Sequence, residues 1–297
     1  MSKNKKPILV TGAHRSGTTW VGQMLCLDKN TRYIHEPFNI DEKRISPLKY
    51  WYEYVSLDSP REKQQAVYDF MNEIISFSGK GIAKDFKVID GPRDVFRFFR
   101  DIYMRATKRA LIKDPLALMS TEWLAQKFNC DVVALIRHPA AFVASLKVKN
   151  WTHSFDHFLE QKDLMEKLSP FAADIEKYVK TPPDIIEQGI LLWNIDYYIL
   201  NEYRKNRPDW IIVKHEDLSL DPVGEYKKIY QKLDLHFGAS VESKIRESSS
   251  ASKAGHLKRD SKKNIHTWKK RLTEAEIERV KKGTEPVWKA YYSDKDW

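Results

Sequence analysis

A loop framed by two glycines near the start of the chain limits the folds open to it. Residues 12–19 read Gly-Ala-His-Arg-Ser-Gly-Thr-Thr. A short apolar run over residues 8–11 precedes the loop and predicts a buried strand, and residues 18–27 follow it with apolar side chains at helical spacing. A strand, a glycine-containing turn and a helix in this order predict the start of a βαβ unit. The unpaired N–H groups at the helix start predict an anion site in the turn.

The remaining apolar pattern alternates between strands and helices. We expect strands at 31–35, 110–112, 131–136 and 210–213. We expect helices at 116–127, 185–203, 222–232 and 273–282, a further helix from Pro139, and mostly helical structure over 47–109 and 151–180. Thr273 and Glu276 are spaced as a capping box. This order predicts a three-layer α/β/α fold with a mostly parallel central sheet, similar to P-loop NTPases, with helical insertions. No linker divides residues 1–297, so we expect a single domain.

Charge and cysteine usage bound the cellular setting. The net charge of +10 indicates an anionic partner without identifying it. Cys26 and Cys130 form neither a CxxC pair nor part of a metal-ligand cluster, so we expect a reducing compartment and no bound metal. The basic start of the chain leads into only about five apolar-rich residues, which predicts no signal peptide. No run of 18 apolar residues occurs, so we expect no membrane span and a cytoplasmic location.

The glycine loop departs from the loop of nucleoside triphosphatases. Its pattern is GxxxxG-T-T rather than GxxxxGK[ST], so Thr18 stands where the lysine that grips triphosphate would be. The positive charge is instead on Arg15, two residues before the second glycine. This arrangement speaks against an ordinary ATPase or kinase and favours a different 5′-phosphate group. A glycine-rich turn without a ligand is the alternative.

The stretch Arg15-Ser16-Gly17-Thr18-Thr19-Trp20 resembles the [RK]-S-G-T-T-W signature of sulfotransferases that use 3′-phosphoadenosine 5′-phosphosulfate (PAPS). The resemblance implies that PAPS is the co-substrate and that five residues of the loop contact its 5′-phosphosulfate: Arg15, Ser16, Gly17, Thr18 and Thr19. It also implies that Trp20 lies near the adenine. Simple core packing is the alternative for Trp20.

A second motif resembles the element that binds the 3′-phosphate in the same family. The strand over 132–136 ends at Arg137, and Ser145 follows eight residues later in an apolar helix. An arginine at the carboxyl end of a parallel strand faces the ligand crevice and offers a rigid fork to phosphate oxygens. The alternative is an arginine that caps the sheet and a serine bonded to its own helix.

A basic segment near the end of the chain resembles the loop that closes over the nucleotide in this family. It carries Lys258 and Arg259 as candidate nucleotide contacts but lacks the RKGxxGxWK form of the cytosolic steroid and phenol enzymes. A solvated basic surface is the alternative. The segment holds these cations against one acid, Asp260: Lys253, Lys258, Arg259, Lys262, Lys263, Lys269, Lys270 and Arg271.

Sulfuryl transfer requires alignment, cations around the moving group and a base for the acceptor proton. Glu36 follows the strand over 31–35 and precedes proline, and carbohydrate and bacterial sulfotransferases often carry a Glu-Pro there with glutamate as base. Glu36 is therefore the first candidate, with His35 and Asp114 as alternatives. Lys113 ends another strand and could reach the sulfuryl oxygens, with Asp114 orienting it; a structural ion pair is equally compatible.

The acceptor is expected to present a hydroxyl or amine on a carbohydrate or small metabolite. Aromatic residues that could stack on such a ring lie within 41–109 and 151–183: Trp51, Tyr52, Tyr54, Phe98, Phe99 and Trp151. His153 and His157 have metal-ligand spacing but no third ligand, so we expect exposed helix histidines.

Two other functions remain open from sequence. A P-loop nucleotide kinase or NTPase fits the fold but lacks the lysine. A non-enzymatic, basic nucleic-acid-binding protein fits the charge, but no recognised nucleic-acid motif is present, so we expect no nucleic-acid partner.

Overall fold

The structure, a computed structural model, describes residues 6–42, 44–76, 92–250, 262 and 265–297. In this part of the chain five strands form one sheet in the order β2-β3-β1-β4-β5, and every pairing is parallel. The strands are β1 (Ile8–Gly12), β2 (Thr31–His35), β3 (Arg109–Lys113), β4 (Asp131–Ile136) and β5 (Ile211–Lys214).

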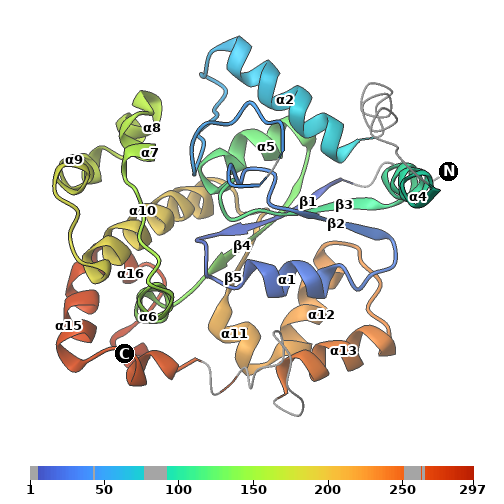
Figure 1. The fold of residues 1–297 in the computed structure, drawn as a ribbon. Coiled ribbons are helices and arrows are strands. Elements are labelled where there is room, and N and C mark those ends of the chain that lie inside the picture. The colour runs from blue at the N-terminus through green and yellow to red at the C-terminus, as the bar shows by residue number, and fades with distance from the viewer. Residues whose placement is uncertain (1–5, 43, 77–91, 251–261, 263–264) are drawn as a thin grey trace.

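Helices cover both faces of the sheet, which gives three layers (Figure 1). The face below the sheet in Figure 1 carries α1 (Thr18–Leu25), α11 (His215–Leu220), α12 (Pro222–Lys232) and α13 (Ala239–Ser249). The other helices are α2 (Arg61–Ile75), α4 (Pro92–Thr107), α5 (Thr121–Phe128), α6 (Pro139–Lys149), α7 (Asp156–Leu159), α8 (Lys162–Lys167), α9 (Ala172–Lys180), α10 (Ile185–Asn206), α15 (Glu274–Gly283) and α16 (Glu285–Trp288). The expected fold class is confirmed.

The pleat of the strands divides the core into two clusters. Ile8 and Val10 of β1 pack with α1 and α12, whereas Leu9 between them packs in the larger cluster that includes α10. This is the alternation expected of successive side chains on a strand. Because both faces of the central strands are buried, their sequences read as continuous apolar runs rather than alternating ones.

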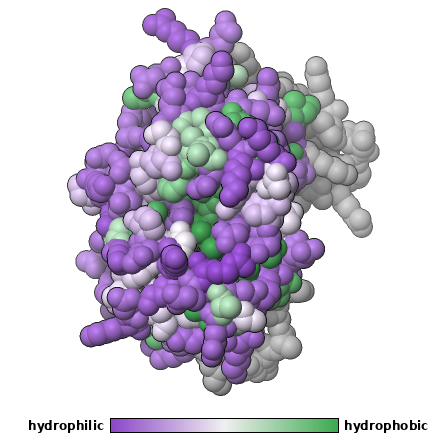
Figure 2. Space-filling view, turned by 90° about the vertical axis from the view of Figure 1, so that its left-hand side faces the viewer, coloured by the Kyte–Doolittle hydropathy of each residue, from purple (hydrophilic) through white to green (hydrophobic). Residues whose placement is uncertain are grey.

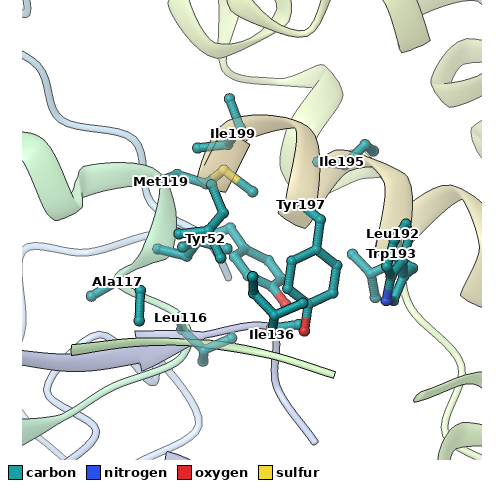
Figure 3. Packing of buried hydrophobic residues seen from close by; sticks show 14 of the residues in the cluster. Tyr52, Leu116, Ala117, Met119, Ile136, Leu192, Trp193, Ile195, Tyr197 and Ile199 are labelled. Carbon is teal, nitrogen blue, oxygen red and sulfur yellow. The ribbon is translucent and has the colours of Figure 1, made fainter. Parts of the chain in front are cut away.

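Helix α10 fixes the carboxyl end of β4. Asp184 caps its start by accepting from the backbone N–H groups of Ile186 and Glu187 at 3.0 Å. The Trp193 indole donates to the Arg137 carbonyl at 2.9 Å, and the Tyr197 hydroxyl accepts from the Arg137 N–H at 2.9 Å. Figure 3 shows Tyr197 beside Tyr52, with both hydroxyls directed toward the region of Ile136.

The strand assignments and the capping box at Thr273 are confirmed. The helical reading of 47–109 is wrong for residues 47–60, which form turns and loops. Side chains satisfy the backbone there: the Glu53 carboxylate accepts from Lys49 N and Tyr50 N, and Ser120 Oγ accepts from Val55 N. The bonds to Glu53 are local and compete with a helix, whereas the bond to Ser120 ties the segment to a distant part of the chain.

Within the basic segment near the end of the chain, residues 253–261, 263 and 264 lie outside the described residues. None of the described helices has the length and apolar character required to cross a bilayer.

Phe142 on α6 is fully buried and contacts His14 of the glycine loop edge-on at 5.3 Å. We predict that Phe142→Ala lowers the free energy of unfolding by about 3–5 kcal/mol, because it leaves a cavity in the core. Val148→Ala, on the same helix at a side chain that is 58% exposed, is the control and should change stability by no more than about 0.5 kcal/mol. Denaturant titration of both variants measures the difference, and equal effects would contradict this view of α6.

Candidate functional site

The glycine loop occupies the carboxyl end of β1, where glycine is required at two positions. Gly12 and Gly17 have φ angles of 133° and 104°. A Cβ on Gly12 would lie 2.5 Å from the Leu135 carbonyl oxygen, and one on Gly17 would lie 2.6 Å from His215 Nδ1. These contacts leave no room for a side chain, so the loop can pass close to β4 and α11 only with glycine at both places.

The two predicted anion-binding motifs meet in space. Arg15 Nε donates to Ser145 Oγ at 3.1 Å, and Arg137 Nη1 donates to the Arg15 carbonyl at 2.5 Å. Ser145 is only 6% exposed, so its hydroxyl is committed to this junction rather than to solvent. The carboxyl ends of β1 and β4 therefore form one cationic site, as expected for neighbouring strands of a parallel sheet.

Several buried polar atoms at this site lack a hydrogen-bond partner within the part of the chain that the structure describes. They include Ser16 Oγ, Arg137 Nε and His215 Nδ1. Burial lowers the pKa of Arg137, and the negative charge of Glu216 acts against this shift by raising it. Buried donors of this kind normally find a partner. A phosphorylated ligand would supply acceptor oxygens to them, so the residues present fit an anionic nucleotide.

The candidate base lies at the end of the neighbouring strand. Glu36 adopts a φ of 36°, its carboxylate forms an ion pair with Lys113, and its second oxygen accepts from Asn39 Nδ2 at 2.9 Å. Burial alone would raise the pKa of Glu36, but the hydrogen bond and charge of Lys113 outweigh it and hold the pKa below its usual value. Glu36 is thus an ionised carboxylate beside a buried cation.

Asp114, next to Lys113, behaves in the opposite way. It is fully buried and accepts from Phe38 N at 2.5 Å and from Leu116 N at 3.0 Å. Burial raises its pKa to about 7. The two carboxylate oxygens of Asp114 therefore bind backbone N–H groups, one of them in the turn that follows Glu36, and do not orient Lys113.

His35 is the more solvent-exposed alternative to Glu36. Its side chain is 47% exposed, and its Nε2 lies 3.9 Å from carboxylate oxygens of both Glu36 and Glu42. Burial and then Lys113 lower its pKa.

The end of the loop and the start of α1 divide into buried and exposed positions. Thr18 is buried, Thr19 is exposed and Trp20 is half-buried. The Trp20 indole donates to Ser248 Oγ at 3.1 Å and contacts the Tyr226 ring edge-on at 5.5 Å. These contacts fit the packing alternative for Trp20 and still leave part of its ring accessible. Lys258 and Arg259 lie outside the described residues.

A buried network beside the loop was not predicted from the sequence. His14 Nδ1 lies 2.7 Å from the Tyr52 hydroxyl, which donates to Asp196 Oδ2 at 3.2 Å. Burial lowers the pKa of His14 to about 3 and raises the pKa of Asp196 well above its usual value. The imidazole is therefore neutral and the carboxyl protonated. His14 was visible within the loop, but its partners Tyr52 and Asp196 are far apart in sequence and carry no local signal.

His215 was also missed, although a signal for it existed. His215 directly follows β5. In the same way, Glu36 and Arg137 directly follow their strands, and Lys113 is the last residue of its strand. The same rule about strand ends would have selected it.

The expectation of exposed helix histidines at 153 and 157 is wrong. His153 precedes α7, and burial lowers its pKa to about 3. His157 Nδ1 accepts from Trp51 N at 2.8 Å. The rings of Trp51, Tyr52 and Phe158 contact His153, and the Tyr50 ring contacts His157 edge-on at 6.1 Å, which the sequence spacing alone did not reveal. Among the described residues, no three His, Cys, Asp or Glu side chains gather closely enough to hold a metal ion.

Comparison with known proteins identifies one family. The statistical model of the sulfotransferase family matches residues 7–238. No curated protein sequence matches the chain significantly.

Solved structures with a similar course of the chain include three sulfotransferases of low identity. The sulfotransferase domain of the curacin biosynthetic pathway is 15% identical, with 96% of this chain and 99% of that chain covered and a TM-score of 0.49. The mouse sulfotransferase SULT7A1 complexed with PAP is 16% identical, with 99% and 88% covered and a TM-score of 0.47. Sulfotransferase STF9 from Mycobacterium avium is 14% identical, with 98% and 78% covered and a TM-score of 0.47.

We predict that Asp196→Asn flattens the pH dependence of stability. The unfolded chain releases this proton above about pH 4, whereas the folded protein retains it, so the folded state loses relative stability as pH rises toward the raised pKa. Above pH 4, the free energy of unfolding of the variant should increase relative to that of the wild type by up to about 1.4 kcal/mol per pH unit. Denaturant titrations between pH 4 and 8 measure this, and a pH-independent difference would show that Asp196 is ionised in the fold.

Proposed function

We propose that this chain, which belongs to the sulfotransferase family, transfers the sulfuryl group of PAPS to a hydroxyl or amine of a carbohydrate or small metabolite. The observation that carries the choice of donor is the junction of Arg15, Ser145 and Arg137 at the carboxyl ends of β1 and β4. A donor with phosphate groups at both its 5′ and 3′ positions requires two cationic elements side by side, and this junction supplies them.

In the proposed complex, residues 15–19 hold the 5′-phosphosulfate and Arg137 with Ser145 holds the 3′-phosphate. Ser16 Oγ and Arg137 Nε, which lack partners within the described residues, would donate to oxygens of this ligand. The start of α1 adds the positive end of a helix dipole. Trp20 is placed near the adenine, and Lys258 and Arg259 are the proposed contacts from the closing segment.

Glu36 is the proposed base. The new S–O bond forms from the acceptor oxygen while the bond from sulfur to the donor's phosphate oxygen breaks, and the acceptor proton passes to the Glu36 carboxylate. Lys113 stabilises charge on the sulfuryl oxygens. The ion pair supports this assignment because a donor anion would draw Lys113 away from Glu36, and the half-buried carboxylate would then become more basic.

We further propose that residues 1–297 act as a single domain. The family match ends at residue 238, but the final helices pack on the same long helix as the core. Asn194 Nδ2 donates to the Gly283 carbonyl at 2.8 Å, and the Tyr291 hydroxyl donates to the Tyr197 carbonyl at 2.8 Å. We propose no role for a membrane or a nucleic acid.

Calorimetric titration with 3′,5′-adenosine bisphosphate (PAP) tests the donor. We expect PAP to bind more tightly than AMP and than ATP with magnesium, because Arg137 reads the 3′-phosphate. Arg137→Ala should weaken PAP binding by about ten- to a hundredfold and AMP binding by clearly less, because AMP loses only the support that Arg137 gives to the Arg15 carbonyl of the loop.

Arg204→Ala is a matched control for this titration, since Arg204 likewise donates to a backbone carbonyl, that of Ala290. This control should bind PAP normally. Tight ATP binding without preference for a 3′-phosphate would reject the sulfotransferase site and favour a nucleotide kinase.

We predict that Glu36→Gln keeps PAP affinity within about twofold but lowers kcat by about 10²–10⁴-fold, the usual contribution of a general base. Radiolabelled sulfate transfer from PAPS measures turnover. Glu42→Gln is the control, because Glu42 lies as close to His35 as Glu36 does but is more exposed. A fully active Glu36→Gln variant would show that Glu36 is not the base and would favour His35 instead.

A further inference from the structure

A cavity of about 350 Å³ lies beside the cationic site at the carboxyl ends of the strands. This edge of the sheet faces left in Figure 1 and faces the viewer in Figure 2, where hydrophobic side chains are visible in a hollow within a mostly hydrophilic surface. The segment that follows Glu36 lines one side of the cavity with Ile40 and Asp41. Trp51, residues 151–154 and His157 line the rest of it.

Contacts from Trp151 connect the cavity to the donor loop. The Arg15 guanidinium lies 5.9 Å from the centre of the Trp151 ring, and the His14 ring contacts Trp151 edge-on at 5.3 Å. On the opposite side, Asn39 donates to Glu36 and directly precedes Ile40. A ligand in this cavity would therefore lie between the donor loop and the candidate base.

The cavity wall differs in charge from the rest of the protein. The chain carries 51 Lys and Arg against 41 Asp and Glu, yet the described residues that line this cavity include no lysine or arginine, and Asp41 is the one acidic residue among them. Burial lowers the pKa of His153 to about 3, so its imidazole is neutral, and His157 Nδ1 accepts from Trp51 N. An anionic acceptor would meet a carboxylate here and no lysine or arginine from the described part of the wall.

The two tryptophans form a corner that suits a ring with an apolar face. Their ring centres are 6.1 Å apart and their planes meet at 80°. Trp151 is 37% exposed, so its surface is available to a ligand. Beside these rings, Asp41 and Thr152 offer oxygens that bind hydroxyl groups. A phenol would prefer a wall that is apolar throughout, whereas stacking surfaces mixed with hydroxyl-binding groups match a sugar.

Building on the proposed function, we propose that this cavity is the acceptor subsite and that it takes an uncharged pyranoside. The sugar ring lies against Trp51 and Trp151, the Asp41 carboxylate accepts from its hydroxyls, and one further hydroxyl points toward Glu36. The cavity selects against acceptors that already carry a carboxylate or sulfate.

The test compares neutral methyl pyranosides of glucose, galactose, mannose and N-acetylglucosamine with methyl glucuronide and 2-naphthol. Sulfate transfer from PAPS gives kcat/KM, and ligand-detected NMR measures binding to the PAP-loaded protein. We expect at least one neutral pyranoside to exceed methyl glucuronide and 2-naphthol by about tenfold or more. Trp51→Ala should lower kcat/KM for that pyranoside by about tenfold, with PAP affinity unchanged. Asp41→Asn should reduce the ratio of kcat/KM for that pyranoside to kcat/KM for methyl glucuronide.

Two control variants test whether these effects are specific to the cavity. Tyr103→Ala removes an aromatic side chain that is 57% exposed on α4, and Asp58→Asn removes a carboxylate on an exposed loop. Both should behave as the wild type. A preference for methyl glucuronide or 2-naphthol, binding by none of the neutral pyranosides, or a Trp51→Ala variant equal to the wild type would overturn the proposal. Failure of PAP to bind would instead reject the donor assignment, and pyranoside binding to the nucleotide-free protein would still report on the cavity.

Discussion

The hydrogen bond from Arg137 to the Arg15 carbonyl joins the two halves of the site. It holds a loop in which Arg15 adopts a φ of 66°, a conformation that residues other than glycine rarely adopt without support. Its donor is in turn fixed by α10, through the Tyr197 hydroxyl on the Arg137 N–H and the Trp193 indole on its carbonyl. The long helix thereby sets the position of the glycine loop, although it contributes no side chain to that loop's anion contacts.

The carboxyl groups at two adjacent strand ends have pKa values shifted in opposite directions, although burial alone would raise both. The hydrogen bond and charge of Lys113 hold the pKa of Glu36 below its usual value, whereas burial outweighs the charge of Lys113 at Asp114 and raises its pKa to about 7. The two carboxyl groups therefore differ in what they can do. Glu36 remains able to accept a proton, and Asp114 holds the backbone of the turn that presents Glu36. In the proposed mechanism, separating the carboxylate that accepts the proton from the one that holds the backbone would allow the turn to stay rigid while Lys113 moves from Glu36 to the donor.

The sequence was sufficient for the sheet and for the residues at its carboxyl edge, because strand ends of a parallel sheet converge and short motifs mark them. Arg15, Glu36, Lys113, Arg137 and Ser145 were found in this way. It was insufficient where side chains rather than periodicity organise the backbone. Residues 47–60 have helical spacing, yet Glu53 and Ser120 bind their N–H groups individually. The pairing of His14 with Tyr52 and Asp196 depends on contacts between segments 38 and 144 residues apart, for which one sequence holds no signal.

The same network explains why the donor loop and the acceptor cavity differ in charge while sharing a wall. A protonated His14 would place a third cation beside Arg15 and Arg137 and would extend positive potential into the cavity. Its burial, and then the charge of Arg15, lower its pKa to about 3 and keep it neutral. The cationic character is thus confined to the strand ends where phosphate groups would bind, and the ring of Trp151 lies between Arg15 and the cavity. Under the proposed function, a basic protein would in this way bind an anionic donor and an uncharged acceptor in adjoining sites, because His14, which contacts Trp151 of the cavity wall, is neutral.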